Sequence, residues 1–139
     1  GGFNPIKDIY KTEVYELAKL RNDNIPSNVY GENKDIIPQN IIEKEPTAEL
    51  RLDQKDSDSL PPYEELDSIL EGLVEYELST KELEEKGFSL DSIKKIENLL
   101  YISEYKRRQS APGVKISLRN FGRDRRYPIT NKYRDRIEK

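Results

Sequence analysis

The chain of 139 residues contains no histidine, cysteine, methionine or tryptophan. Without histidine it lacks both the usual general base near neutral pH and the commonest metal ligand. Without cysteine it can form no disulfide and carry out no thiolate chemistry. No apolar run in it approaches the roughly 18 residues that a membrane span requires. Because no methionine opens the chain, we expect it to be the carboxy-terminal piece of a longer protein.

Apolar residues are also scarce, and charge is abundant and unevenly distributed. Apolar residues make up 34% of the chain and charged residues 37%, against about 45–50% and about 25% in typical globular domains. We therefore expect the chain to rely on further protein surface for a full core. Residues 104–139 hold 12 Lys or Arg and 4 Asp or Glu, a net charge of +8, and residues 1–103 hold 12 and 23, a net charge of −11. This split predicts an anionic partner for the basic end: nucleic acid, a nucleotide, or the acidic part of the same protein.

Helical periodicity predicts a mostly α-helical chain with a long polar loop and an irregular tail containing short strands. The first helix is expected over 8–21 with Asp8 as its N-cap, and a short one opens at Pro38. Further helices are expected over 62–76, from the Ser79 capping box, and over 89–107. The predicted buried stripes are Tyr10, Val14, Leu17, Ala18 and Leu20 in the first helix, Tyr63, Leu66, Ile69, Leu70 and Leu73 in the third, and Leu90, Ile93, Ile96, Leu99 and Leu100 in the last. The polar loop covers 46–62, the basic tail covers 109–139, and alternation predicts a short strand over 114–118.

Two residues in the first half of the chain are candidates for phosphate binding. Lys11 falls in the first turn of a predicted helix, where the dipole disfavours a cation unless an anionic ligand shares the site. The pattern alone favours an ordinary solvated lysine. The hydroxyl of Thr47 can bind a phosphate or magnesium, although a helix cap is the simpler interpretation. Asp53, Asp56 and Asp58 are carboxylates of the kind that hold divalent cations, but their spacing matches no known ion-binding loop.

The basic tail allows two interpretations. In the first, Arg and Lys side chains bind phosphates and aromatic side chains stack on bases, as in single-strand-binding proteins. The residues concerned are Lys106, Arg107, Arg108, Arg119, Arg123, Arg125 and Arg126, with Tyr105, Phe121, Tyr127 and Tyr133. In the second, the tail is a solvated arm whose first cations face a helix dipole. The chain has no phosphate-binding loop, dinucleotide fingerprint, Ser/His/Asp set or zinc pattern, so the residues alone assign no complete catalytic site.

Five blocks of sequence together resemble one enzyme family. Residues 1–12 resemble the segment that follows a Gly-Asp motif in the synthetase domain of NAD synthetases. Residues 45–50 and 53–63 resemble the mobile active-site loop of that family and the helix after it. Residues 104–113 and 121–130 resemble the ending of the bacterial glutamine-dependent type. The blocks occur in the family's order, and the resemblance extends over nearly the whole chain, although residues 22–36 and 74–98 carry little of the family pattern.

The resemblance implies a parent domain with an α/β Rossmann-like fold of the ATP pyrophosphatase type, preceded by a nitrilase-like glutaminase domain. It implies a ligase that adenylates deamido-NAD with ATP and then amidates it with ammonia, giving NAD+, AMP and pyrophosphate. Mg2+ would balance the phosphate charge. The implied partners are the rest of the synthetase domain, the glutaminase domain and further copies of the enzyme. The implied enzyme is cytoplasmic and binds neither nucleic acid nor membrane.

The resemblance also implies roles for individual residues. Lys11 and Thr47 match residues that contact the ATP phosphates, and Lys106 matches a lysine near the nicotinate end of deamido-NAD, with Tyr105 and Arg107 beside it. No catalytic residue or metal ligand is implied, and the family's Ser-Gly-Gly-x-Asp-Ser loop is absent. We therefore expect the chain alone to be inactive, and the arginines of 119–136 to dock against acidic parts of the enzyme. A small nucleic-acid-binding module with an acidic helical body stays open as the alternative.

Overall fold

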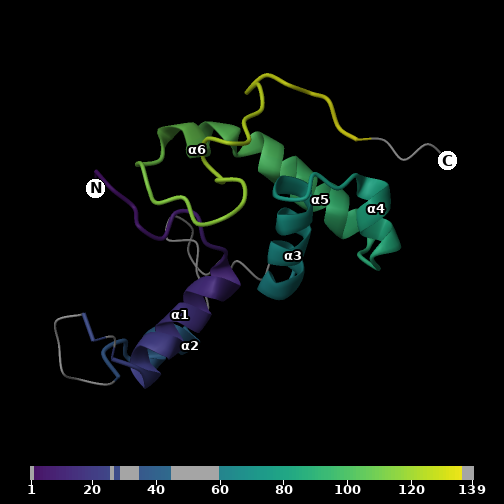
Figure 1. Ribbon diagram of the computed structural model, residues 1–139. Coiled ribbons are helices and arrows are strands. Elements are labelled where there is room, and N and C mark those ends of the chain that lie inside the picture. Colours follow the sequence, from purple (N-terminus) through teal and green to yellow (C-terminus); the bar gives the residue numbers. More distant parts are fainter. Residues whose placement is uncertain (1, 26, 29–34, 45–59, 136–139) are drawn as a thin grey trace, which may run out of the picture. The chain divides into compact units, whose positions relative to one another are not determined.

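A computed structural model of the chain describes residues 2–25, 27–28, 35–44 and 60–135. In these ranges the helices are α1 (Lys11–Asp23), α2 (Gln39–Glu43), α3 (Tyr63–Val74), α4 (Thr80–Glu85), α5 (Leu90–Ile102) and α6 (Glu104–Gln109) (Figure 1). The predicted mostly helical character is confirmed. No helix in this described part is long and apolar enough to cross a membrane. The predicted loop over 46–62 lies outside the described residues except for 60–62, as does Thr47.

The strand predicted over 114–118 is wrong, because the described residues contain no strand. Its backbone donors are occupied by side chains instead. The N–H groups of Ile116 and Ser117 donate to the Asp8 carboxylate, and that of Leu118 donates to the Glu75 carboxylate. A strand needs those donors for pairing with a neighbour. The described part of the tail is therefore irregular, as predicted, but without the strand.

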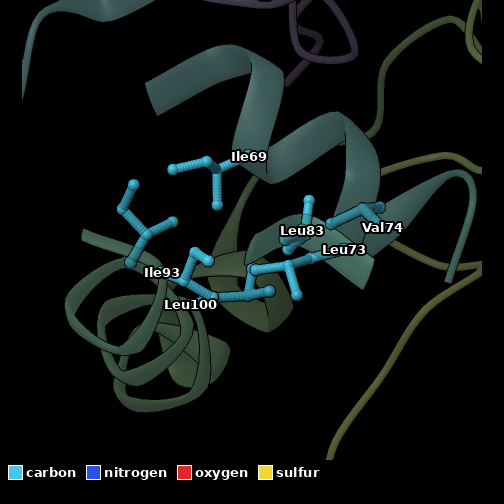
Figure 2. Packing of buried hydrophobic residues seen from close by; sticks show 7 residues of the cluster. Ile69, Leu73, Val74, Leu83, Ile93 and Leu100 are labelled. Carbon is cyan, nitrogen blue, oxygen red and sulfur yellow. The ribbon is translucent and has the colours of Figure 1, made fainter. Parts of the chain in front are cut away.

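The chain divides into two compact units. The large unit comprises Gly1–Ile9 and Glu64–Lys139, and the small unit comprises Tyr10–Tyr63. The hydrophobic core belongs to the large unit and consists of Ile69, Leu73, Val74, Leu83, Ile93, Ile96 and Leu100. Figure 2 shows these side chains converging from α3, α4 and α5. Most of the stripes predicted for α3 and α5 therefore face the core, whereas Tyr63, Leu90 and Leu99 are not part of it.

Gly72 explains how closely α3 and α4 approach each other. A Cβ built on Gly72 would lie 2.7 Å from Cδ2 of Leu83, which is completely buried. Any larger residue would push the Leu83 side chain out of a close-packed core, where even one methylene is felt. Glycine at this position leaves room for the Leu83 side chain of α4 against α3.

Local capping signals set the boundaries of α4 and the start of α5, as predicted. The Ser79 N–H donates to the Glu82 carboxylate at 2.8 Å, and the Glu82 N–H donates to the Ser79 hydroxyl at 3.3 Å. This reciprocal pair is a capping box. The chain then turns at Gly87, whose φ of +100° favours glycine. Ser89 caps α5 by accepting from the Ser92 N–H at 3.1 Å.

The helix predicted over 89–107 is broken at Ser103, so this boundary was wrong. The Leu100 carbonyl, which an unbroken helix would offer to the Glu104 N–H, accepts bonds from two side chains. The Arg107 guanidinium donates to it at 2.9 Å and the Ser103 hydroxyl at 3.2 Å. Such side-chain donors compete with the helical ladder and end it. The chain restarts as α6, with Lys106, Arg107 and Arg108 in its last turn.

The small unit departs furthest from the predictions. Its helix α1 begins at Lys11, and Asp8 is not its N-cap. The predicted apolar face is not buried, because Leu17 and Leu20 are 48% and 55% exposed. The buried residue of α1 is Asn22, whose amide donates to the Ile37 carbonyl at 2.8 Å and accepts from its N–H at 3.0 Å. This pair holds the chain that leads into α2, which follows Pro38 as predicted.

Candidate functional site

Lys11 is the first residue of α1 and is exposed, so its predicted place in a first helical turn is confirmed. Its ammonium nitrogen lies 5.5 Å from the centre of the Tyr15 ring and 6.0 Å from that of the Tyr63 ring. The carboxylate of this turn, Glu13, accepts the Tyr10 N–H at 2.6 Å. The positive end of the helix dipole and a lysine thus occupy one place, which favours an anionic ligand there.

The second set of predicted site residues lies on the short helix α6. Tyr105 is 46% exposed and Lys106 is also exposed, so both side chains are accessible to a ligand. Arg107 points inward and is buried. Its guanidinium donates to Leu100, forms an ion pair with Glu104, and lies 5.2 Å from the centre of the Phe121 ring. The side chains of Tyr105 and Lys106 are therefore exposed to solvent, whereas that of Arg107 is buried.

Glu104 is the buried anion that organises α6, and sequence reasoning missed it. Only 1% of it is exposed, and it pairs with Arg107 and, at 3.3 Å, with Arg108. Burial raises the pKa of Glu104, but the hydrogen bond and charge of Arg107, the Tyr127 N–H and the hydrogen bond of Arg108 outweigh burial and leave that pKa lowered. The i,i+3 and i,i+4 spacing of the three residues was the available signal. It shows that Glu104 and the arginines can meet, but not that they are buried.

Asp8 is a second buried anion, and it connects the first segment of the chain to residues 116–121 of the tail. One carboxylate oxygen accepts the Ile116 N–H at 2.7 Å and both the N–H and the hydroxyl of Ser117 at 2.9 Å. The other accepts the Phe121 N–H at 2.9 Å. Burial raises the pKa of Asp8, but the donors from Ile116, Ser117 and Phe121 outweigh it, so the pKa is lowered. The carboxylate that was predicted to cap α1 thus organises the tail instead.

The segments around Asp8 approach each other closely enough to need glycine. The Asn4 N–H donates to the Pro112 carbonyl at 2.9 Å, and the Lys7 ammonium donates to the Ala111 carbonyl at 2.9 Å. A methyl group on Gly113 would collide with the Asn4 carbonyl oxygen. We call these contacts of residues 4–8 with 111–122 the Asp8 clasp. The clasp anchors the chain just before Lys11 and just after Lys106.

The described part of the basic tail, 109–135, contacts other residues of the large unit. Arg119 forms an ion pair with Glu77, as the predicted docking of arginines on acidic parts requires. The ring centres of Tyr127 and of Tyr101 in α5 lie 4.2 Å apart. The guanidinium carbon of Arg134 lies 4.4 Å from the Tyr101 ring centre. Burial, and to a smaller extent the neighbouring Tyr127, raises the pKa of Tyr101 to about 12. Tyr127, one of the predicted base-stacking residues, stacks within the protein.

In the part of the chain that the structure describes, no metal centre gathers the predicted site residues. Within the described ranges, no three or more Asp or Glu side chains come together in a way that could hold a metal ion. A cavity of about 230 Å3 lies in the large unit between the turn around Ser79, α5 and the tail. It is lined by residues such as Glu97, Arg125 and Tyr127, and by none of the predicted site residues.

Comparison with known proteins identifies close relatives of the whole chain. A sequence profile described as NAD synthase matches residues 1–110. The glutamine-dependent NAD(+) synthetase of Rhodobacter capsulatus is 52% identical over 135 residues, which are 97% of this chain and 24% of that protein. That of Thermotoga maritima is 46% identical over 135 residues, 97% of this chain and 22% of that protein. The chain thus spans about a quarter of the length of these curated relatives.

A solved structure is similar as well. It is a glutamine-dependent NAD+ synthetase from Acinetobacter baumannii in complex with ADP. It is 37% identical to this chain, with a TM-score of 0.54 over 94% of this chain and 21% of that one. The similarity therefore extends to three-dimensional structure and again concerns a small part of a longer protein.

Proposed function

The chain belongs to the NAD synthase family, as its sequence blocks indicated, and from this premise we propose that it is the carboxy-terminal part of the synthetase domain of a glutamine-dependent NAD+ synthetase. The observation that carries the proposal is the 52% identity over nearly the whole chain to a protein of that name. The parent Rossmann-like sheet, the nitrilase-like glutaminase domain, the homo-oligomer and the cytoplasmic location belong to the same proposal.

The proposed reaction has two steps, and both develop or displace negative charge. The nicotinate carboxylate of deamido-NAD attacks the α-phosphorus of ATP, an O–P bond forms, and pyrophosphate leaves. Ammonia then attacks the acyl carbon and AMP leaves, giving NAD+. Preorganised cations around the phosphates stabilise such charge in the transition state. Mg2+ would supply part of this neutralisation when bound, and the described residues contain no cluster of three or more carboxylates that could hold it.

Lys11 is proposed to bind the ATP phosphates. It is exposed at the start of a 13-residue helix, so its charge and the helix dipole act on a ligand together. The ADP complex of the related Acinetobacter baumannii enzyme supports adenine-nucleotide binding by proteins of this kind. Thr47 stays assigned to the same phosphates by resemblance.

Lys106 and Tyr105 are proposed to contact deamido-NAD, with Arg107 beside them. The first two are accessible on α6, whereas the Arg107 guanidinium is bound to Glu104 and the Leu100 carbonyl. Arg107 therefore serves this site by holding α6 in place. The ammonium of Lys106 remains available to an anionic group of the substrate.

Kinetics of the complete enzyme test the two assignments separately. Lys11→Ala should raise the KM for ATP about tenfold, because a charge-assisted contact is lost. Lys106→Ala should raise the KM for deamido-NAD by a similar factor. Lys19→Ala and Lys95→Ala remove exposed lysines from α1 and α5 and should change neither KM. Unchanged kinetics in both site variants would refute the assignment.

Activity of the isolated chain is a further test. Incubated with ATP, Mg2+, deamido-NAD and ammonia, the 139-residue chain should form no NAD+, because charge neutralisation at the phosphates needs groups that it lacks. Measurable NAD+ formation by the isolated chain would contradict this part of the proposal.

The alternative of a nucleic-acid-binding module is not favoured. Tyr127 and Phe121 pack against Tyr101 and Arg107 of the same chain, and Arg119 is paired with Glu77. Stacking on bases would require these contacts to be given up. Tight oligonucleotide binding that weakens steeply with added salt would reinstate that alternative.

A further inference from the structure

We infer that Tyr15 and Tyr63 are positioning residues for Lys11, whose rings orient its ammonium toward an anionic substrate group without neutralising it. The inference rests on the proposed role of Lys11 at the ATP phosphates. All three residues belong to the small unit. None of the sequence patterns singled out the two tyrosines for this role.

The geometry is that of a cation held by two aromatic faces. Tyr15 stands four residues after Lys11 in α1, so the two side chains share one face of the helix. The Lys11 nitrogen lies 5.5 Å from its ring centre and 6.0 Å from that of Tyr63, within the range of about 6 Å for cation–π attraction. Both rings are half-buried, whereas Lys11 is exposed. The rings are therefore held more firmly than the ammonium that they attract.

Electrostatics explains why rings suit this position better than a carboxylate. A lysine at a helix N-terminus is repelled by the dipole and needs some favourable contact to stay ordered. A carboxylate would provide one, but it would also compete with a phosphate for the ammonium. Among the described residues no carboxylate pairs with Lys11, and Glu13 in the same turn is bound to the Tyr10 N–H. A ring attracts the cation through its quadrupole and carries no net charge, so the full positive charge stays available.

Conformational freedom gives the second reason. A lysine side chain has a flexible four-carbon stem and loses much rotamer entropy when a ligand immobilises it. Two rings that already attract the ammonium restrict the side chain before the ligand binds and so reduce that loss. This is preorganisation, and it should appear in the KM for ATP rather than in the KM for deamido-NAD.

Substitutions in the complete enzyme separate the ring from the hydroxyl. Tyr15→Leu and Tyr63→Leu should each raise the KM for ATP about two- to fivefold, the range that corresponds to an exposed cation–π contact. Tyr15→Phe keeps the ring and should leave that KM unchanged. Tyr76→Leu removes an exposed tyrosine of the large unit and serves as the matched control.

A fluorinated series at position 15 isolates the electronic effect from packing. Phenylalanine with no, one, two or three ring fluorines keeps nearly the same shape while its negative face weakens. The KM for ATP should rise stepwise along the series, and the trend should disappear when Lys11→Ala is added. A merely structural role of the ring would leave the series flat.

The outcomes distinguish the inference from the proposal beneath it. If Lys11→Ala raises the KM for ATP and the fluorinated series is flat, the ring inference is overturned and the role of Lys11 stands. If Lys11→Ala leaves the KM for ATP unchanged, the role of Lys11 fails and the ring inference fails with it. A stepwise series that depends on Lys11 supports both.

Discussion

Replacing Asp8 by asparagine should loosen the tail that follows α6. The carboxylate accepts four hydrogen bonds, three on one oxygen and one on the other. An asparagine oxygen can keep the donors of Ile116 and Ser117, but its NH2 group then faces the Phe121 N–H, donor against donor. One hydrogen bond to a charged acceptor is lost, at about 1.5–3 kcal/mol, and the other three lose their charge assistance. Together these effects should cost about 2–4 kcal/mol in the free energy that holds the tail in place.

Amide hydrogen exchange in the complete enzyme measures this effect where it occurs. The N–H groups of Ile116, Ser117 and Phe121 are protected by the carboxylate itself. A loss of 2–4 kcal/mol in local opening free energy corresponds to about 30- to 1,000-fold faster exchange at neutral pH. Asp91→Asn removes an exposed carboxylate from the first turn of α5 and should cost at most about 1 kcal/mol.

The pH dependence gives the same prediction a second test. The pKa of Asp8 in the folded chain lies below its ordinary value of 3.8, because backbone donors stabilise the charged form. The stabilisation is therefore fully present above pH 3.8 and is lost as the pH falls through the folded-state pKa. The difference between the native chain and Asp8→Asn should shrink below about pH 4. Equal exchange rates at neutral pH, or a difference that acidification does not change, would refute this account of the clasp.

Three further predictions concern the same unit. Gly113→Ala places a methyl group against the Asn4 carbonyl oxygen and should lower the unfolding midpoint, so an unchanged midpoint would contradict the close approach. Glu104→Gln leaves the Arg107 guanidinium buried without its counter-ion and should cost about 3–5 kcal/mol in denaturant unfolding, with a loss below 1 kcal/mol counting against the buried pair. Tyr101, whose pKa is raised to about 12, should ionise later than the exposed tyrosines in an ultraviolet titration, and a transition near pH 10 for every tyrosine would disprove its burial against Tyr127.

Local patterns predicted the helices of the large unit well. The stripe that holds Ile69 and Leu73 repeats every three to four residues, and the capping box at Ser79 spans only three. Interactions of this kind depend on the geometry of one helix, so the sequence contains them completely. The first-turn position of Lys11 was predictable for the same reason.

Predictions failed where a local pattern leaves the partner unspecified. The apolar positions of α1 mark a face, but Leu17 and Leu20 are exposed, because the pattern does not say which surface covers that face. The break at Ser103 was not predicted for the same reason. An uninterrupted apolar repeat does not reveal that Arg107 donates a hydrogen bond to the Leu100 carbonyl.

The sequence by itself therefore determined the helical class, the caps at Ser79 and Ser89, the positions of Lys11 and Lys106 on helices, and the family to which the chain belongs. Only the tertiary structure decided that Asp8 binds the tail, that Arg107 points inward while Lys106 points outward, and that Arg119 of the tail pairs with Glu77 of the same unit. The physical reason is separation along the chain. Asp8 and its partners lie 108 to 113 residues apart, and no period of two or four residues relates groups at that distance.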